Sequence, residues 1–131
     1  MQTPSHCSIL VVDDHPVTRE PLAKLLRYEG FSATCAANGV DALAELERMP
    51  PPDLILLDVL MPRMNGVDFL QAVRADPRWR DIPVIALTGV MDPNQIQRLS
   101  ELGVVDIMTK AKFTVDELFE RVRAHVSAPR M

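Results

Sequence analysis

The chain has 131 residues, of which 47% are hydrophobic and 24% charged, and its net charge is −4. This composition predicts one folded domain spanning 1–131, with a core at about 8–126, and excludes a disordered segment. The acidic balance argues against nucleic-acid binding by this chain alone, because such binding usually needs a basic face. No apolar stretch approaches the ~20 residues that cross a bilayer, so no membrane contact and a cytoplasmic location are expected.

The first predicted elements are a strand at 9–12 and a helix that follows it. Pro16 is favoured in a first helical turn, and Gly30 is favoured just after a helix end. Pro21 lies inside this helical pattern and removes one backbone donor, so we expect a kink or a loosened first turn there. The helix should therefore run from about Pro16 to Gly30.

Strand-like and helix-like patterns then alternate to the end of the chain. The run at 54–57 is apolar on both faces, which is typical of a central strand covered by helices on two sides. In the helix before it, Val40, Leu43 and Leu46 should face inward. The remaining elements are expected as strands at 32–36, 84–87 and 104–109 and helices at 40–49, 67–75, 93–102 and 114–126, the last with a stripe of Val115, Leu118, Phe119 and Val122.

Five β–α units in series predict an α/β fold, a three-layer α/β/α sandwich around a five-stranded parallel sheet. Such sheets bind ligands outside the carboxyl ends of their strands. Polar residues stand at or just after four of these ends, namely Asp13 with Asp14, Asp58, Thr88 and Lys110. Clustered carboxylates suit Mg²⁺, which prefers oxygen ligands, and a carboxylate can act as the nucleophile in phosphoryl transfer.

These residues also carry a resemblance to a known family. Asp13-Asp14, Asp58, Met-Pro-Arg-Met-Asn-Gly at 61–66, Thr88 and Lys110 occur in this order along the alternating pattern. Over residues from about 8 to 126, the chain resembles the receiver domain of bacterial two-component response regulators, in particular the single receivers of chemotaxis type. The resemblance implies a flavodoxin-like sheet with strand order 2-1-3-4-5.

The resemblance also implies a role for each site residue. Asp58 would be the phospho-acceptor, and Mg²⁺ would be bound by Asp13, Asp14, Asp58 and the backbone carbonyl of Leu60. Lys110 would contact the phosphoryl group. We therefore expect Mg²⁺ as the cofactor.

The residues that would transmit the signal depart in part from the family pattern. Thr88 would be the switch hydroxyl, and Gly66 would permit a tight turn before the following helix. Ile107 stands where receivers usually carry an aromatic residue. Ala111 follows Lys110 where the family usually has proline in a cis linkage, a geometry that is costly before a residue other than proline.

The function implied is a signalling module rather than an enzyme. A sensor histidine kinase or a histidine phosphotransfer protein would donate the phosphoryl group, and an unknown output protein would bind the face formed by the fourth helix, fifth strand and fifth helix. Output is expected through a partner because the chain ends soon after the last predicted helix, unless the chain is a fragment of a larger regulator or hybrid kinase.

Two other classes remain open. The first is a receiver-like adaptor that binds protein without being phosphorylated. The second is a small Mg²⁺-dependent phosphatase with an aspartyl nucleophile, although such enzymes need a D-x-D arrangement and here Asp13 and Asp14 are adjacent. Elsewhere, His15 is expected to be a first-turn helix residue, and Trp79 to be a loop residue that covers the core. Cys7 and Cys35 are expected to be reduced thiols with a structural or incidental role.

Overall fold

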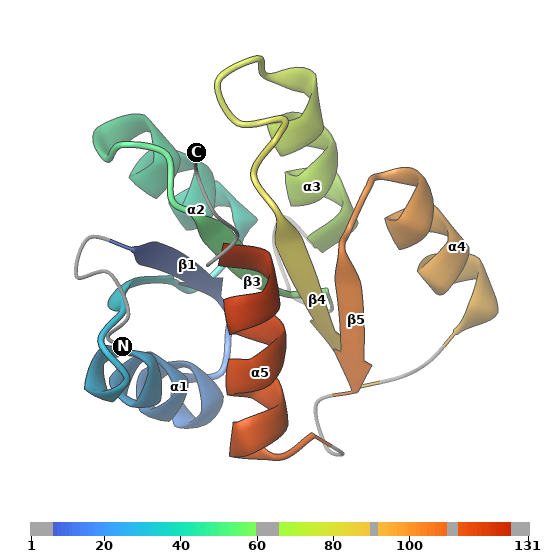
Figure 1. Cartoon of the computed structure of the whole chain (residues 1–131). Coiled ribbons are helices and arrows are strands. Elements are labelled where there is room, and N and C mark those ends of the chain that lie inside the picture. Colours follow the sequence, from blue (N-terminus) through green and yellow to red (C-terminus); the bar gives the residue numbers. More distant parts are fainter. Residues whose placement is uncertain (1–6, 60–65, 90–91, 110–112, 127–131) are drawn as a thin grey trace.

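The computed structural model describes residues 7–59, 66–89, 92–109 and 113–126 (Figure 1). Within these ranges five strands and five helices alternate, as the sequence predicts. The elements are β1 (Ser8–Val12), α1 (Pro16–Tyr28), β2 (Ser32–Ala36), α2 (Gly39–Arg48), β3 (Leu54–Asp58), α3 (Gly66–Ala75), β4 (Val84–Thr88), α4 (Pro93–Glu101), β5 (Asp106–Thr109) and α5 (Val115–Val126). Among the described helices, none is both long and apolar enough to span a membrane.

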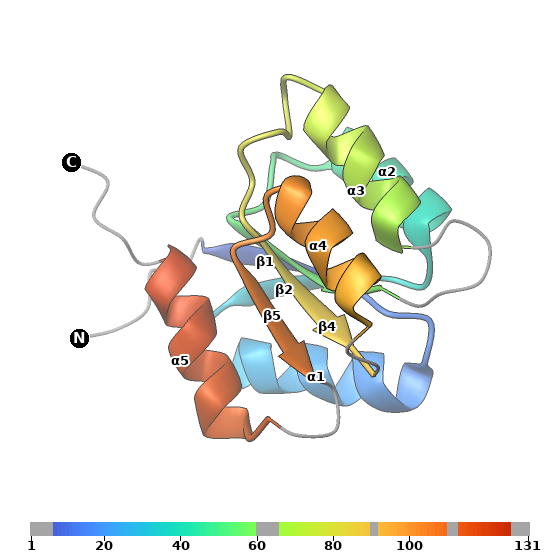
Figure 2. The same ribbon diagram turned by 90° about the vertical axis from the view of Figure 1, so that its right-hand side faces the viewer.

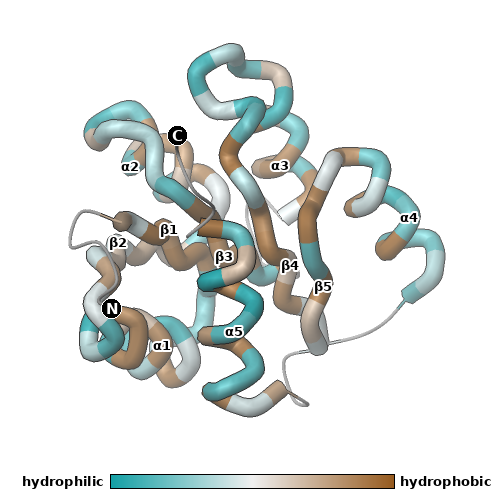
Figure 3. The backbone as a smooth tube through the Cα atoms, viewed as in Figure 1, coloured by the Kyte–Doolittle hydropathy of each residue, from teal (hydrophilic) through white to brown (hydrophobic). Residues whose placement is uncertain are grey.

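The strands form one parallel sheet in the order β2-β1-β3-β4-β5, which confirms the expected flavodoxin-like order. Helices α1 and α5 cover one face, and α2, α3 and α4 cover the other (Figure 2). Each face has its own buried apolar cluster, one holding Leu26 and Val122 and the other holding Leu46 and Phe69. Strands β3 and β4 are buried throughout, and β1 is buried except at its first residue. The central strands are mainly hydrophobic, whereas the surrounding helices alternate between hydrophilic and hydrophobic residues (Figure 3).

Helix α1 begins and ends where the sequence predicts. Pro16 is its first residue, and Gly30 lies just beyond the end with a φ of 100°, a conformation that glycine adopts without strain. The helix is continuous through Pro21, and the amides of Thr18 and Arg19 both donate to the His15 carbonyl. The expected loosening of the first turn is therefore absent, because Pro21 is exposed and removes only one intrahelical hydrogen bond.

Three further local predictions are wrong. Val40 is exposed, because α2 starts at Gly39 under an Asn38 cap and buries Ala42 in its place, whereas Leu46 is buried and Leu43 partly buried as predicted. Val115 is also exposed, although the rest of the predicted α5 stripe is buried.

The third correction concerns the last strand, which is shorter than the predicted 104–109. The amide of Val104 donates to the Leu99 carbonyl, 3.2 Å away, and so closes the turn that ends α4. The strand therefore starts only at Asp106.

Two arginines link the ends of helices through hydrogen bonds, away from the carboxyl edge of the sheet. The guanidinium of Arg74 in α3 donates to four carbonyl oxygens, and burial lowers its pKa from its ordinary value. The acceptors are the carbonyls of Arg80, Ile82, Leu102 and Gly103, at distances of 2.7 to 3.3 Å. Arg74 thus fixes the exit of α4 against the segment that leads into β4.

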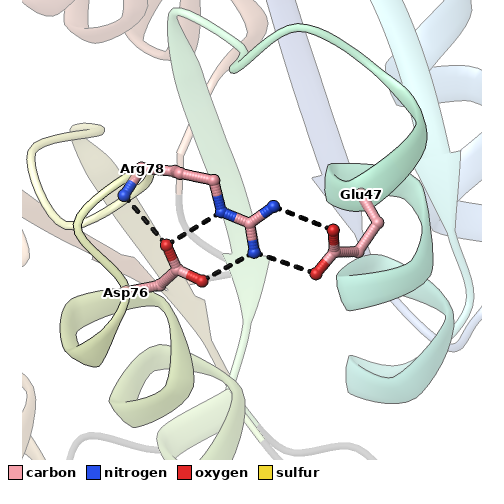
Figure 4. Close-up of polar contacts among 3 residues, drawn as sticks. All are labelled: Glu47, Asp76 and Arg78. Carbon is pink, nitrogen blue, oxygen red and sulfur yellow. Dashed lines mark hydrogen bonds and ion pairs between the residues drawn. The ribbon is translucent and has the colours of Figure 1, made fainter.

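Arg78 makes the second connection, on the surface (Figure 4). Its guanidinium binds the carboxylate of Asp76 and, through two hydrogen bonds of 2.9 Å, that of Glu47 in α2. It also lies over the ring of Trp79, 4.3 Å from the centroid. Trp79 is buried, which confirms its predicted role as a cover of the core.

Candidate metal and phosphoryl site

The parallel register brings the two main acidic segments together. Val12 at the end of β1 pairs with Leu57 in β3, so the residues that follow, Asp13 and Asp58, come to the same edge of the sheet. Oxygens of Asp13, Asp14 and Asp58 and a ring nitrogen of His15 all lie within 4.8 Å of one another. We call these four residues the acidic cluster.

Two of the three carboxylates are almost inaccessible to solvent. Asp13 and Asp58 are 1% and 2% exposed, whereas the side chain of Asp14 is 20% exposed and that of His15 is 58% exposed. Like charges at such short separations repel one another more strongly when they are removed from water. A bound cation would offset this repulsion.

Asp13 is held in place by its surroundings. Its amide donates to the Ala36 carbonyl of β2 at 3.1 Å, and its Oδ1 accepts from the amide of His15 at 2.9 Å. Its carbonyl oxygen accepts from Nη1 of Arg19, also at 2.9 Å. One of these hydrogen bonds therefore orients the carboxylate directly, and the other two fix the backbone of Asp13.

The donor set fits a hard divalent cation. Oδ1 of Asp14 is screened from solvent and accepts no hydrogen bond within the described part of the chain. Nδ1 of His15 lies 3.0 Å from this oxygen, and the two form an ion pair only when the imidazole is protonated. An oxygen in such a position has the character of a metal ligand, and carboxylate oxygens are what Mg²⁺ prefers.

Thr88 lies at the same edge of the sheet. It is the last residue of β4, it is 1% exposed, and its neighbour Leu87 pairs with Asp58. Its partner in β5 is Thr109, the residue before Lys110. Lys110, Leu60 and Ala111 lie outside the described residues.

Gly66, predicted for a tight turn, is required by a close approach of two backbone segments. Its amide donates to the carbonyl of Val59 at 2.9 Å. A Cβ at this position would lie 2.6 Å from Cα of Val59 and 3.0 Å from the carbonyl oxygen of Asp58. No side chain fits there, so the start of α3 is pressed directly against the residues around Asp58.

A doubly wound parallel sheet with a carboxylate cluster at its carboxyl edge defines a class of α/β domains that bind a cation or a phosphate there. The family model for the response regulator receiver domain matches residues 9–123. The chain belongs to this family, the receiver domains of two-component signal transduction.

Relatives and solved structures agree with this assignment. The chain is 40% identical over 119 residues to the sensory transduction protein RegX3 of Mycolicibacterium smegmatis, a match that covers 89% of this chain and 49% of that protein. The chain thus spans about half the length of this curated relative.

Two solved receiver domains of histidine kinases are similar as well. The receiver from Syntrophus aciditrophicus matches with a TM-score of 0.84 and 36% sequence identity, and the match covers 95% of this chain and 93% of the Syntrophus chain. The receiver from Pseudomonas aeruginosa matches with a TM-score of 0.83 and 28% sequence identity, and the match covers 94% of this chain and 99% of the Pseudomonas chain. The Pseudomonas structure has a magnesium ion coordinated in the active site cleft.

Sequence reasoning missed two residues of this site. His15 is the residue that caps α1 rather than a first-turn residue, and its ring joins the acidic cluster. Its position next to Asp14 was the available signal. Arg19 binds the backbone of Asp13 from one turn into α1, and no pattern along the chain indicates this contact.

Proposed function

We propose that this receiver accepts a phosphoryl group on Asp58 from a phosphohistidine of a partner protein. The observation that carries the proposal is the position of Asp58, an almost fully buried carboxylate at the end of the central strand, within 4.8 Å of two further carboxylates.

Asp13, Asp14, Asp58 and the backbone carbonyl of Leu60 are the residues proposed to hold Mg²⁺. The similar kinase receiver from Pseudomonas aeruginosa, with magnesium in its active site cleft, supports this choice. When bound, the ion supplies positive charge that offsets the negative charge of the carboxylates and of an incoming phosphoryl group. Asp13 and Asp14 position this charge, and Asp13 is fixed by its contacts with Ala36 and Arg19.

The reaction is a transfer between two side chains. A carboxylate oxygen of Asp58 attacks the phosphorus, a P–O bond forms, and the P–N bond to the donor imidazole breaks, leaving a neutral imidazole after it takes up a proton. Lys110 is proposed to bind a phosphoryl oxygen as a point charge. Thr88 is proposed to donate its hydroxyl to another phosphoryl oxygen and so to report the event.

The signal is proposed to leave through α4, β5 and α5 by a shift between two forms of this region. Ile107 is half-buried against the cluster that includes Leu99 of α4, and it has no ring to turn inward. We therefore assign the coupling to a rearrangement of β4 and α4 rather than to an aromatic rotamer. The partners are a sensor histidine kinase or phosphotransfer protein and an output protein, all in the cytoplasm.

The chain is proposed to act as a single receiver domain and as a signalling module without turnover chemistry of its own. The test is incubation with acetyl phosphate and Mg²⁺ followed by a phosphate-affinity gel. Wild type should shift, and Asp58→Asn should not. Asp116→Asn, which changes an exposed aspartate in the first turn of α5, is the matched control and should shift like wild type. A full shift of Asp58→Asn would overturn the acceptor assignment.

A further inference from the structure

We propose that His15 gives the metal site a nitrogen ligand, so that the site binds imidazole-preferring divalent metals such as Co²⁺ and Ni²⁺ as well as Mg²⁺. This inference rests on the proposed function, because the carboxylates are the same. It adds a specificity-determining residue and a class of metal to that site.

The geometry places the imidazole among the carboxylates. Nδ1 of His15 lies 3.0 Å from Oδ1 of Asp14 and 3.5 Å from Oδ1 of Asp13. These separations match the spacing of neighbouring ligand atoms around one ion whose metal–ligand bonds are about 2.1 Å long. The four donors of the acidic cluster therefore can share one cation.

The backbone of His15 is fixed while its ring is free to adjust. The His15 amide is bound to Oδ1 of Asp13 at 2.9 Å, and the residue caps α1 without a side-chain hydrogen bond to the helix. The ring is 58% exposed, so it can reorient toward an ion without repacking the core. Its position beside the carboxylates is set by the chain, and its side chain has no capping role to give up.

The donor chemistry then decides between metals. Mg²⁺ takes oxygen ligands and gains little from an imidazole. Co²⁺, Ni²⁺ and Zn²⁺ bind imidazole well, and affinity for mixed nitrogen and oxygen sites rises from Mn²⁺ through Co²⁺ to Ni²⁺. A site of three carboxylates and one imidazole therefore selects transition metals through His15 and leaves Mg²⁺ to the carboxylates.

A purely electrostatic role of His15 makes a different prediction. If the ring only moderated the negative charge of the cluster, its removal would change the affinity for Mg²⁺ and for Co²⁺ in the same direction and by similar factors. If the ring is a ligand, its removal weakens Co²⁺ binding alone. Comparing two metals therefore separates the two roles.

The experiment is calorimetric titration of the whole chain with Mg²⁺ and with Co²⁺, for wild type, His15→Ala and a double His6→Ala/His125→Ala variant. The chain has three histidines, so the double variant keeps His15 as the only one. His15→Ala should weaken Co²⁺ binding at least about tenfold and leave Mg²⁺ binding unchanged within about twofold. The double variant should bind both metals like wild type.

A second readout detects the bond itself. Pulsed electron paramagnetic resonance of bound Mn²⁺ should show modulation from an imidazole nitrogen in wild type and in the double variant, and none in His15→Ala. Equal Co²⁺ affinity in wild type and His15→Ala, or loss of the nitrogen signal in the double variant, would overturn the inference. If Mg²⁺ fails to bind wild type while Co²⁺ binding depends on His15, the proposed Mg²⁺-dependent function fails and the inference stands.

Discussion

Carboxylate oxygens of Asp13 and Asp58 lie within 4.8 Å of each other at the edge of the sheet. This proximity follows from strand register, since Val12 pairs with Leu57, Asp13 directly follows β1, and Asp58 is the last residue of β3. Both side chains are almost completely buried, so their mutual repulsion is opposed by the packing of two central strands. The fold thus holds together charges that would separate in an open chain, and it is poised to bind a cation.

The first prediction concerns this repulsion. Asp13→Asn keeps the oxygen that accepts from the His15 amide but removes one negative charge, so the variant should melt at a higher temperature than wild type in buffer containing a chelator. Mg²⁺ at 100 times its Kd should add about 2.7 kcal/mol to the free energy of unfolding of wild type and so raise its Tm. The Tm of the variant should rise much less. Thermal melts with and without Mg²⁺ measure both effects, and Asp116→Asn is the control. Equal Mg²⁺ responses in Asp13→Asn and wild type would contradict the assignment.

The second prediction concerns the contact between α3 and the segment after Asp58. Gly66→Ala should lower the free energy of unfolding by about 1–3 kcal/mol, because a methyl group would overlap backbone atoms of Val59. Gly89→Ala is the matched control, since a Cβ there meets nothing within 4 Å. Urea denaturation of the two variants measures the difference. Equal stability of Gly66→Ala and Gly89→Ala would show that α3 can shift away at no cost.

The third prediction concerns Arg74. Arg74→Met leaves four carbonyl oxygens without their guanidinium donor and should cost about 2 kcal/mol or more of stability, since hydrogen bonds to charged groups are the strong ones. Arg98→Met is the control, because Arg98 is exposed and, among the described residues, its side chain forms only a long ion pair with Glu101. Chemical denaturation monitors both variants. If Arg98→Met lowered the free energy of unfolding as much as Arg74→Met, the role given to Arg74 would be contradicted.

The fourth prediction concerns the Arg78 clamp and pH. Hydrogen bonds from Arg78 hold the pKa of Glu47 below 4.5 and that of Asp76 below 3.8, their ordinary values. A carboxyl group with a lowered folded-state pKa contributes stability above its unfolded pKa and loses it as the pH falls through its folded pKa. The Tm difference between wild type and Arg78→Met should therefore be present at neutral pH and shrink as the pH falls below these values.

The same clamp should respond to salt. Its three charged side chains lie at the surface, so its contribution is small and is reduced by added salt. Thermal melts of Arg78→Met across pH and salt series check both trends. If the Tm difference between wild type and Arg78→Met grew as the pH fell, this explanation would be contradicted.

The fifth prediction concerns Thr88. Thr88→Val removes the hydroxyl while keeping the branched shape in a fully buried position. The acceptor is untouched, so labelling by acetyl phosphate should persist. Amide chemical-shift changes in α4 and β5 on addition of a beryllofluoride mimic should become smaller than in wild type. Shift changes equal to those of wild type would remove Thr88 from the proposed signalling route, and Thr109→Val serves as the control on the neighbouring strand.

Much of this protein could be predicted from local pattern. The alternation of strands and helices, the ends of α1, the central position of β3 and the polar residues at the strand ends all follow from hydrophobic periodicity and from glycine and proline preferences. The strand order came from the resemblance, and the sheet confirms it. These features are local, or shared by a whole family, and therefore survive without knowledge of packing.

Other features were decided only by the tertiary structure. Val40 was predicted to be buried because its spacing suits a helix face, but the rotation of α2 about its axis is set by contacts with β2 and α3 that no spacing reveals. The close approach of Gly66 to Val59 and the arrival of the His15 ring among three carboxylates are of the same kind. The sequence by itself determined which residues end each strand, since that depends on local periodicity. Which atoms meet there depends on register and on helix rotation, and these are determined only when the layers pack together.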